Sequence, residues 1–194
     1  MEIGATKAVQ DRLKTTKIEE SKGASLVFCW DTHLTKIKGR NVLFIVNASN
    51  RYTIAMTDIE PRNWNYYTMY IRSVIHGVMQ EMGYSEEQIG RYFKMSGDTT
   101  VTKTHGRKSV GGINRMVMDA QYFGKKLEKE AKYQWELSEY LNRDICQPEG
   151  FDAYGYPSEL FKLDMERLGI AAKREPAKVI DFAQYIENNR GTND

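Results

Sequence analysis

The sequence predicts an α+β protein whose sheet is mostly antiparallel, with helices packed on one side and a C-terminal helical extension. Short β-branched and apolar segments, separated by turn residues, occupy the first 58 residues. Beyond residue 60, apolar side chains recur at helical spacing instead. The 194 residues are 41% hydrophobic, which is enough for one core. We therefore expect a single domain over residues 1–170 and a helical arm with a flexible tail over residues 171–194.

The first 58 residues favour an antiparallel meander. Asn41–Asn47, "NVLFIVN", is a continuous apolar run, typical of a strand buried on both faces. Turn residues follow it, and Arg51–Thr57 returns as the partner of a hairpin. Further elements are expected in this part of the chain: strands at residues 1–5, 25–30 and 33–37, and a short helix at residues 6–14.

The middle of the chain predicts two helices. Tyr67, Ile71 and Val78 belong to one apolar stripe at 3.6-residue spacing, which indicates an amphipathic helix ending near residue 83. Ser85 and Gln88 then have the spacing of a capping box, so a second helix is expected at residues 86–95.

The last third predicts a strand followed by helices. Residues 99–104 are rich in threonine and favour a strand. A helical stripe begins after them, close to Ser109. Ser158 is expected to cap a helix that ends near residue 169, and a last helix is expected at residues 177–188.

Overall charge excludes one class of function. The chain carries 28 basic and 26 acidic residues, whereas a globally basic nucleic-acid binder shows a larger excess. Any anion site must therefore be local. Cys29 and Cys146 form no disulfide or CxxC pattern, and the sequence shows no apolar leader and no membrane span. We expect a cytoplasmic protein without a membrane partner.

The stretch "TTVTKTHGRKSVGGINR", Thr99–Arg115, predicts a phosphate site. A helix that starts after a strand presents unpaired backbone N–H groups and the positive end of its dipole. Cationic side chains would surround the anion, glycines would let it approach the backbone, and Ser109 would act as the N-cap or as a direct ligand. The predicted phosphate-binding residues are Lys103, Arg107, Lys108, Ser109, Gly111, Gly112, Asn114 and Arg115.

The same stretch has a second interpretation, an exposed basic turn with a capping serine. It is not a Walker loop, because Val101 stands where a glycine is needed and Arg107 interrupts the Gly-Lys pair. It is not a dinucleotide fingerprint either. Composition alone leaves both interpretations open.

Several of these residues resemble a known pattern. Thr102-Lys103-Thr104, followed by Arg107, Ser109, Val110, Gly112 and Asn114, is similar to the motif of an uncharacterised bacterial family, a domain of unknown function. Such domains stand alone or at the front of plasmid and mobile-element proteins, and the resemblance covers roughly residues 1–160. Lys108 is an addition to the motif, and Arg115 stands where an acid is frequent. The resemblance implies an α+β fold and a plasmid or phage setting, and it implies no activity.

Two other groupings carry chemistry. Asp31 and His33 are two residues apart, a spacing that would place them on one face of a strand as an acid–base pair or as two metal ligands. No third ligand lies nearby in the sequence, so we expect no metal and no cofactor. We interpret the two residues as an exposed strand end. His105 could serve a metal-independent ribonuclease, although no partner base is identifiable. Cys29 is interpreted as a buried strand residue.

The leading hypothesis is a protein that binds a phosphate-bearing ligand, nucleic acid in the first place, through Lys103–Arg115. The first alternative is a protein-interaction module, such as an antitoxin or an accessory subunit, that contacts an acidic partner with the same turn. The second alternative is a ribonuclease-type toxin that uses His105. Whether the protein is an enzyme stays open at this point.

Overall fold

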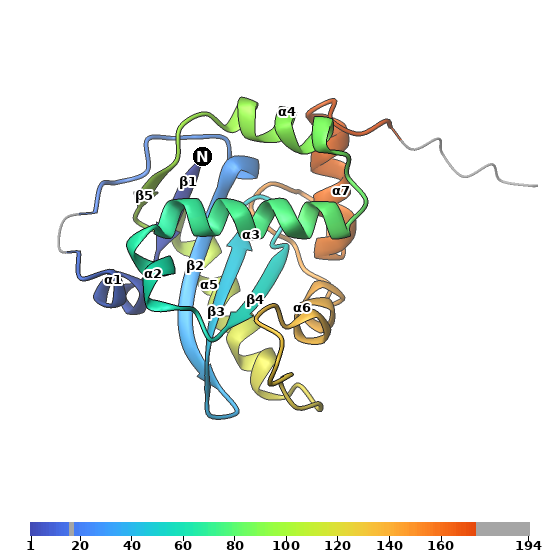
Figure 1. Ribbon diagram of the computed structural model, residues 1–194. Helices are drawn as coiled ribbons and strands as arrows, with labels where there is room; N and C mark the ends of the chain where they lie inside the picture. The colour runs from blue at the N-terminus through green and yellow to red at the C-terminus, as the bar shows by residue number, and fades with distance from the viewer. Residues whose placement is uncertain (16–17, 174–194) are drawn as a thin grey trace, which may run out of the picture.

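The sheet has five strands in the order β4-β3-β2-β1-β5 (Figure 1). We describe residues 1–15 and 18–173 of a computed structural model. The strands are β1 (Glu2–Ala5), β2 (Cys29–Ile37), β3 (Arg40–Asn47), β4 (Thr53–Thr57) and β5 (Thr100–Thr102). The N-terminal strand β1 therefore lies inside the sheet, between β2 and β5.

The sheet is mixed rather than mostly antiparallel. The expected meander is confirmed for β2, β3 and β4, which pair antiparallel. In contrast, β1 pairs parallel with both β2 and β5. The reason is the helix α1 (Lys7–Leu13), which follows β1 and allows the chain to return before β2 begins in the same direction.

The second strand is longer than the sequence indicates. Two strands were expected, at residues 25–30 and 33–37, but Leu26–Phe28 form a 3₁₀ turn and β2 runs without a break from Cys29 to Ile37. Asp31 and Thr32 lie in its middle, and both are fully buried. Polar residues here do not end the strand, because β3 continues to pair with them.

Seven helices are found in the described residues. Besides α1 they are α2 (Pro61–Asn65), α3 (Tyr67–Glu81), α4 (Glu86–Ser96), α5 (Gly106–Gln121), α6 (Trp135–Asn142) and α7 (Pro157–Arg167). The capping box is confirmed, since Ser85 and Gln88 exchange both of its hydrogen bonds at the start of α4. The expected cap at Ser158 is wrong: the N-cap of α7 is Tyr156, two residues earlier, and Pro157 lies in the first turn.

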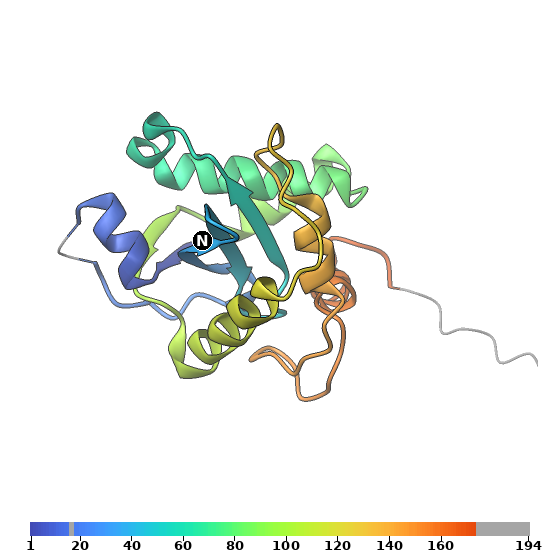
Figure 2. The ribbon, with the colours of Figure 1, turned by 90° about the horizontal axis from the view of Figure 1, so that it is seen from below.

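The helices cover both faces of the sheet, not one (Figure 2). Leu43 and Ile45 of β3 face a core that includes side chains of α3, α4 and α7. Phe44 and Val46 alternate with them and face a second core with α5 and α6. This follows from the uninterrupted apolar run of β3, which supplies buried side chains to both faces.

Two further predictions concern the C-terminal arm and membrane-spanning helices. The arm predicted at residues 171–194, with its helix at residues 177–188, falls almost wholly outside the described residues. Among the described helices, none combines the length and the apolar character that crossing a membrane requires.

Candidate functional site

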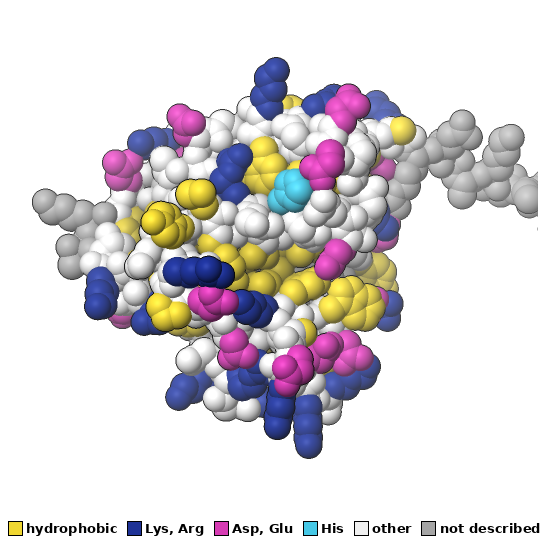
Figure 3. Space-filling model, in the orientation of Figure 1, with side chains coloured by type: hydrophobic (Ala, Val, Ile, Leu, Met, Phe, Trp, Pro, Cys, Tyr) yellow, Lys and Arg dark blue, Asp and Glu magenta, His cyan; other side chains and the backbone are white. Residues whose placement is uncertain are grey.

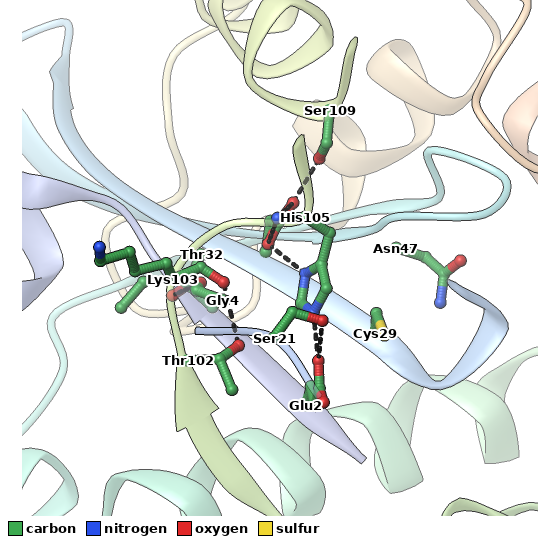
Figure 4. Close-up of polar contacts among 12 residues, drawn as sticks. Glu2, Gly4, Ser21, Cys29, Thr32, Asn47, Thr102, Lys103, His105 and Ser109 are labelled. Carbon is green, nitrogen blue, oxygen red and sulfur yellow. Dashed lines mark hydrogen bonds and ion pairs between the residues drawn. The ribbon is translucent and has the colours of Figure 1, made fainter. Parts of the chain in front are cut away.

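The strand-turn-helix element singled out in the sequence lies at the edge of the sheet, where β5 leads into α5. Because β5 pairs with β1, the residues after it lie beside the end of the N-terminal strand. Gly106 has a φ of +94°, a left-handed conformation that glycine adopts without strain, and it lets the chain turn directly into α5. This turn directs the side chain of the preceding residue, His105, toward the sheet (Figure 4).

His105 lies between the carboxylates of Asp31 and Glu2, and Figure 4 shows its contact with Glu2. Its Nδ1 is 2.7 Å from Asp31 Oδ1, and its Nε2 is 3.0 Å from Glu2 Oε2. The side chains are almost inaccessible to solvent, with 2% of His105, 5% of Glu2 and none of Asp31 exposed. Both ring nitrogens are therefore engaged inside the protein.

The surroundings set the charge of this cluster. Burial lowers the pKa of His105, but the hydrogen bond and the charge of Asp31, together with Cys29, outweigh burial and raise that pKa to about 10. Burial raises the pKa of Glu2, yet hydrogen bonds from the Ser21 hydroxyl, the Lys22 backbone and His105 together lower it. At neutral pH His105 is thus an imidazolium that faces the ionised carboxylate of Glu2.

The Asp31 carboxylate also occupies the region in front of α5. It accepts hydrogen bonds from the backbone N–H of His105 at 3.2 Å and from the hydroxyl of Ser109. The N-cap of α5 is His105, four residues before the expected cap at Ser109. An internal anion therefore already uses the positive end of this helix.

Gly4 makes this arrangement possible. A Cβ atom on Gly4 would lie 1.8 Å from Asp31 Oδ1 and 3.0 Å from the Cα of Thr104. Any larger residue would displace the carboxylate that holds His105 and Ser109.

Five of the predicted phosphate-binding residues line one cavity of about 250 Å³ on the flank of α5. These residues are Lys108, Ser109, Gly111, Gly112 and Arg115. The cavity is also lined by Arg51 and Glu149, from loops distant in the sequence. Its charged lining therefore holds three cations and one carboxylate.

Arg51 is held in place against α5. It adopts a left-handed backbone conformation, with φ at 61°, and its guanidinium donates to the carbonyl of Gly112 at 2.9 Å. A Cβ on Gly112 would lie 3.1 Å from Arg51 Nε, so the glycine gives the guanidinium room to lie against the helix. Lys108, on the same flank, donates to the Pro148 carbonyl at 3.3 Å.

The other predicted residues lie apart from this cavity. Lys103 pairs with Glu20 on the surface. Arg107 and Asn114 are exposed, and neither is among the residues that line the cavity. His105 points toward the sheet (Figure 4), and it is not among the residues that line the cavity.

Asp31 and His33 do not form a pair. Asp31 binds His105, whereas His33 Nδ1 lies 3.2 Å from the hydroxyl of Thr6. The expected exposed strand end is wrong as well, since Asp31 is fully buried in the middle of β2. Burial lowers the pKa of His33.

Sequence reasoning missed Glu2 and Arg51. Glu2 meets His105 across 103 positions of the chain, and Arg51 meets Gly112 across 61, so no local pattern could reveal either contact. One local feature of the sequence marks the position of Arg51: the run of small and turn-forming residues Ala48–Asn50, which places Arg51 next to a turn.

The geometry defines an α+β protein with a mixed sheet, a buried carboxylate–histidine cluster between strands β1 and β2 and the start of α5, and a basic cavity on the flank of α5. The chain belongs to the family described as domain of unknown function DUF6933, whose model matches residues 2–160. No curated protein matches the chain. No solved structure matches it either.

Proposed function

We propose that this protein binds a phosphate-bearing ligand, nucleic acid in the first place, in the cavity on the flank of α5. The observation that carries the proposal is the convergence of Arg51, Lys108 and Arg115 on one cavity. These cations come from a loop after β3 and from two turns of α5. Their only acidic neighbour in the lining is Glu149.

The cavity has the features that phosphate recognition requires. An arginine whose guanidinium is already positioned loses little freedom when it binds an anion, and its planar fork matches two phosphate oxygens. Arg115 is accessible, with 68% of its side chain exposed, and its partner Asp119 is 3.4 Å away. Beside Gly111 there is open space, so a ligand can approach the helix backbone.

The face of the molecule opposite α5 also bears on where a phosphate-bearing ligand would bind. In Figure 3, which views the side covered by α3, acidic and basic side chains are interspersed around a band of hydrophobic ones. That face offers no extended positive field for a polyanion. Because the net charge of the whole chain is only +2, a local group of cations such as Arg51, Lys108 and Arg115 has to supply the attraction for a polyanion.

The geometry does not favour the ribonuclease hypothesis. A general acid or base must reach the substrate, but the His105 side chain is 2% exposed and both its nitrogens are bonded internally. The interaction-module hypothesis uses the same cavity with an acidic protein as the ligand. A cytoplasmic, mobile-element setting is part of our proposal, and its support is the sequence resemblance alone.

Fluorescence anisotropy with a labelled single-stranded oligonucleotide tests the proposal. Affinity should fall with salt, with a slope of log K against log salt of about −2 for three phosphate contacts. Arg115→Ala and Lys108→Ala should each make the slope shallower by about 0.7. Lys126→Ala, which removes an exposed lysine elsewhere, is the matched control and should leave the slope unchanged.

Two results would overturn the proposal. One is the absence of binding to RNA, DNA and free nucleotides at low salt. The other is an equal loss of affinity in Lys126→Ala and Arg115→Ala, which would show a diffuse charge effect. Capture of an acidic protein without binding to oligonucleotides would favour the interaction module.

A further inference from the structure

Three side chains with metal-ligating atoms converge where the adjacent strands β1 and β2 lie next to the turn before α5. Glu2 comes from β1, Cys29 from the start of β2 and His105 from the turn before α5. One carboxylate oxygen, the Sγ and one ring nitrogen all lie within 4.8 Å of one another. Figure 4 shows the three side chains around a common point. All three are buried.

The spacing is close to that of a metal centre. Zinc bonds of about 2.0–2.3 Å place the ligand atoms of a tetrahedral site roughly 3.3–3.8 Å apart. Glu2 Oε2 and His105 Nε2 are 3.0 Å apart. An ion between them would therefore separate these two atoms by only a few tenths of an ångström.

The outer contacts of the histidine are also those of a metal ligand. Metal-bound imidazoles usually donate their second N–H to a carboxylate, which fixes the ring and its tautomer. Here Nδ1 of His105 lies 2.7 Å from Asp31 Oδ1. Asp31 is itself held by the Ser109 hydroxyl and the His105 backbone. This leaves Nε2 directed at Glu2.

We propose that Glu2, Cys29 and His105 bind one divalent transition-metal ion, zinc in the first place, with Asp31 as a positioning residue. Thiolate and imidazole ligands favour zinc and its neighbours over magnesium and calcium. The ion would connect β1, β2 and the start of α5. Because the ligands are buried, its role is to hold these elements together. The site is separate from the cavity of the proposed function.

Cobalt substitution tests the site directly. Chelator-treated protein, with any tag at its C-terminus, should bind one Co²⁺ per chain and show sulfur-to-cobalt charge transfer in the near ultraviolet. Zinc should displace the cobalt. Zinc at about a hundredfold excess over its Kd should also raise Tm by roughly 5–10 °C.

Matched variants separate the ligands from their surroundings. Cys29→Ser should abolish the charge-transfer band, and Cys146→Ser, which changes the other buried cysteine, should retain it. Glu2→Gln should weaken cobalt binding at least tenfold. Asp31→Asn should keep the band and raise Kd about 10–100-fold. His76→Gln, a change at a half-exposed histidine, should alter nothing.

A measurement on the wild-type protein alone can refute the metal site, even if the variants fail to fold. Native mass spectrometry in zinc should show one added ion. Absence of a bound ion there, or a charge-transfer band that survives in Cys29→Ser, would overturn the proposal.

Discussion

Gly4 shows how one residue without a side chain fixes the position of three others. The Asp31 carboxylate lies against its Cα, and that carboxylate in turn holds His105 and Ser109. The identity of residue 4 therefore matters for the cluster even though glycine contributes no polar atom to it.

Gly4→Ala should destabilise the protein by about 2–3 kcal/mol, because its methyl group would overlap Asp31 Oδ1. Urea denaturation measures the change. Gly111→Ala is the control: no atom lies within 4 Å of its Cβ position in α5, so it should gain about 0.5–1 kcal/mol. Equal stability of Gly4→Ala and wild type would contradict the close contact.

His33 should make stability depend on pH near neutrality. Burial lowers its pKa below the ordinary value of 6.5, so the unfolded chain takes up a proton more readily than the folded protein does. The free energy of unfolding should therefore fall as the pH drops from 6.5 through the folded pKa.

The comparison with His33→Gln isolates this effect. The difference in unfolding free energy between wild type and variant should change between pH 7.5 and 5, and His76→Gln serves as the control. A difference that stays constant over that range would show that His33 titrates normally in the folded protein.

At the scale of elements, the start of α4 illustrates what a local pattern can establish. Ser85 and Gln88 are three residues apart, and their two hydrogen bonds need nothing from the rest of the fold. Ser109 and Ser158 look similar in the sequence, but neither caps a helix. In α5 the serine is drawn to Asp31, and in α7 the proline sets the start of the helix.

Ser85→Ala should cost about 1 kcal/mol, because the Gln88 backbone N–H loses its acceptor at the start of α4. Thermal denaturation followed by circular dichroism measures the loss. Ser158→Ala should stay within about 0.5 kcal/mol of wild type. If both variants lost the same stability, the assignment of the caps would be wrong.

The sequence was a better guide to elements than to their partners. The apolar run of β3 and the stripe of α3 predicted both elements, since each pattern repeats within a few residues. The pairing of β1 with β5 joins residues about 100 positions apart, and nothing in "MEIGA" distinguishes a central strand from an edge strand. Likewise, the sequence predicted the residues of the basic cavity that belong to α5, but it missed Arg51, which comes from a distant loop.

On the scale of the whole molecule, stability depends on two cores, one on each face of the sheet, and strands β2, β3 and β4 contribute side chains to both. Phe44 and Ile45 are adjacent and both fully buried, but they face opposite sides of β3. Each layer of helices therefore contributes to the stability of the same sheet.

Phe44→Ala should cost about 3–5 kcal/mol and Ile45→Ala about 2–5 kcal/mol, since each leaves a cavity in a packed core. Met69→Ala, at a side chain that is 67% exposed, should have little effect. Urea denaturation compares the three. A small cost for Phe44→Ala alone would mean that α5 and α6 cover the sheet only loosely.

The position of β1 inside the sheet, between β2 and β5, has a consequence for biosynthesis. During synthesis β1 precedes β5, one of its two neighbours in the sheet, by 98 residues. At 5–20 residues per second, translation leaves that side of β1 without its partner for roughly 5–20 s. Nascent chains therefore carry an open sheet edge during this interval, when chaperones or early-forming helices have to shield it.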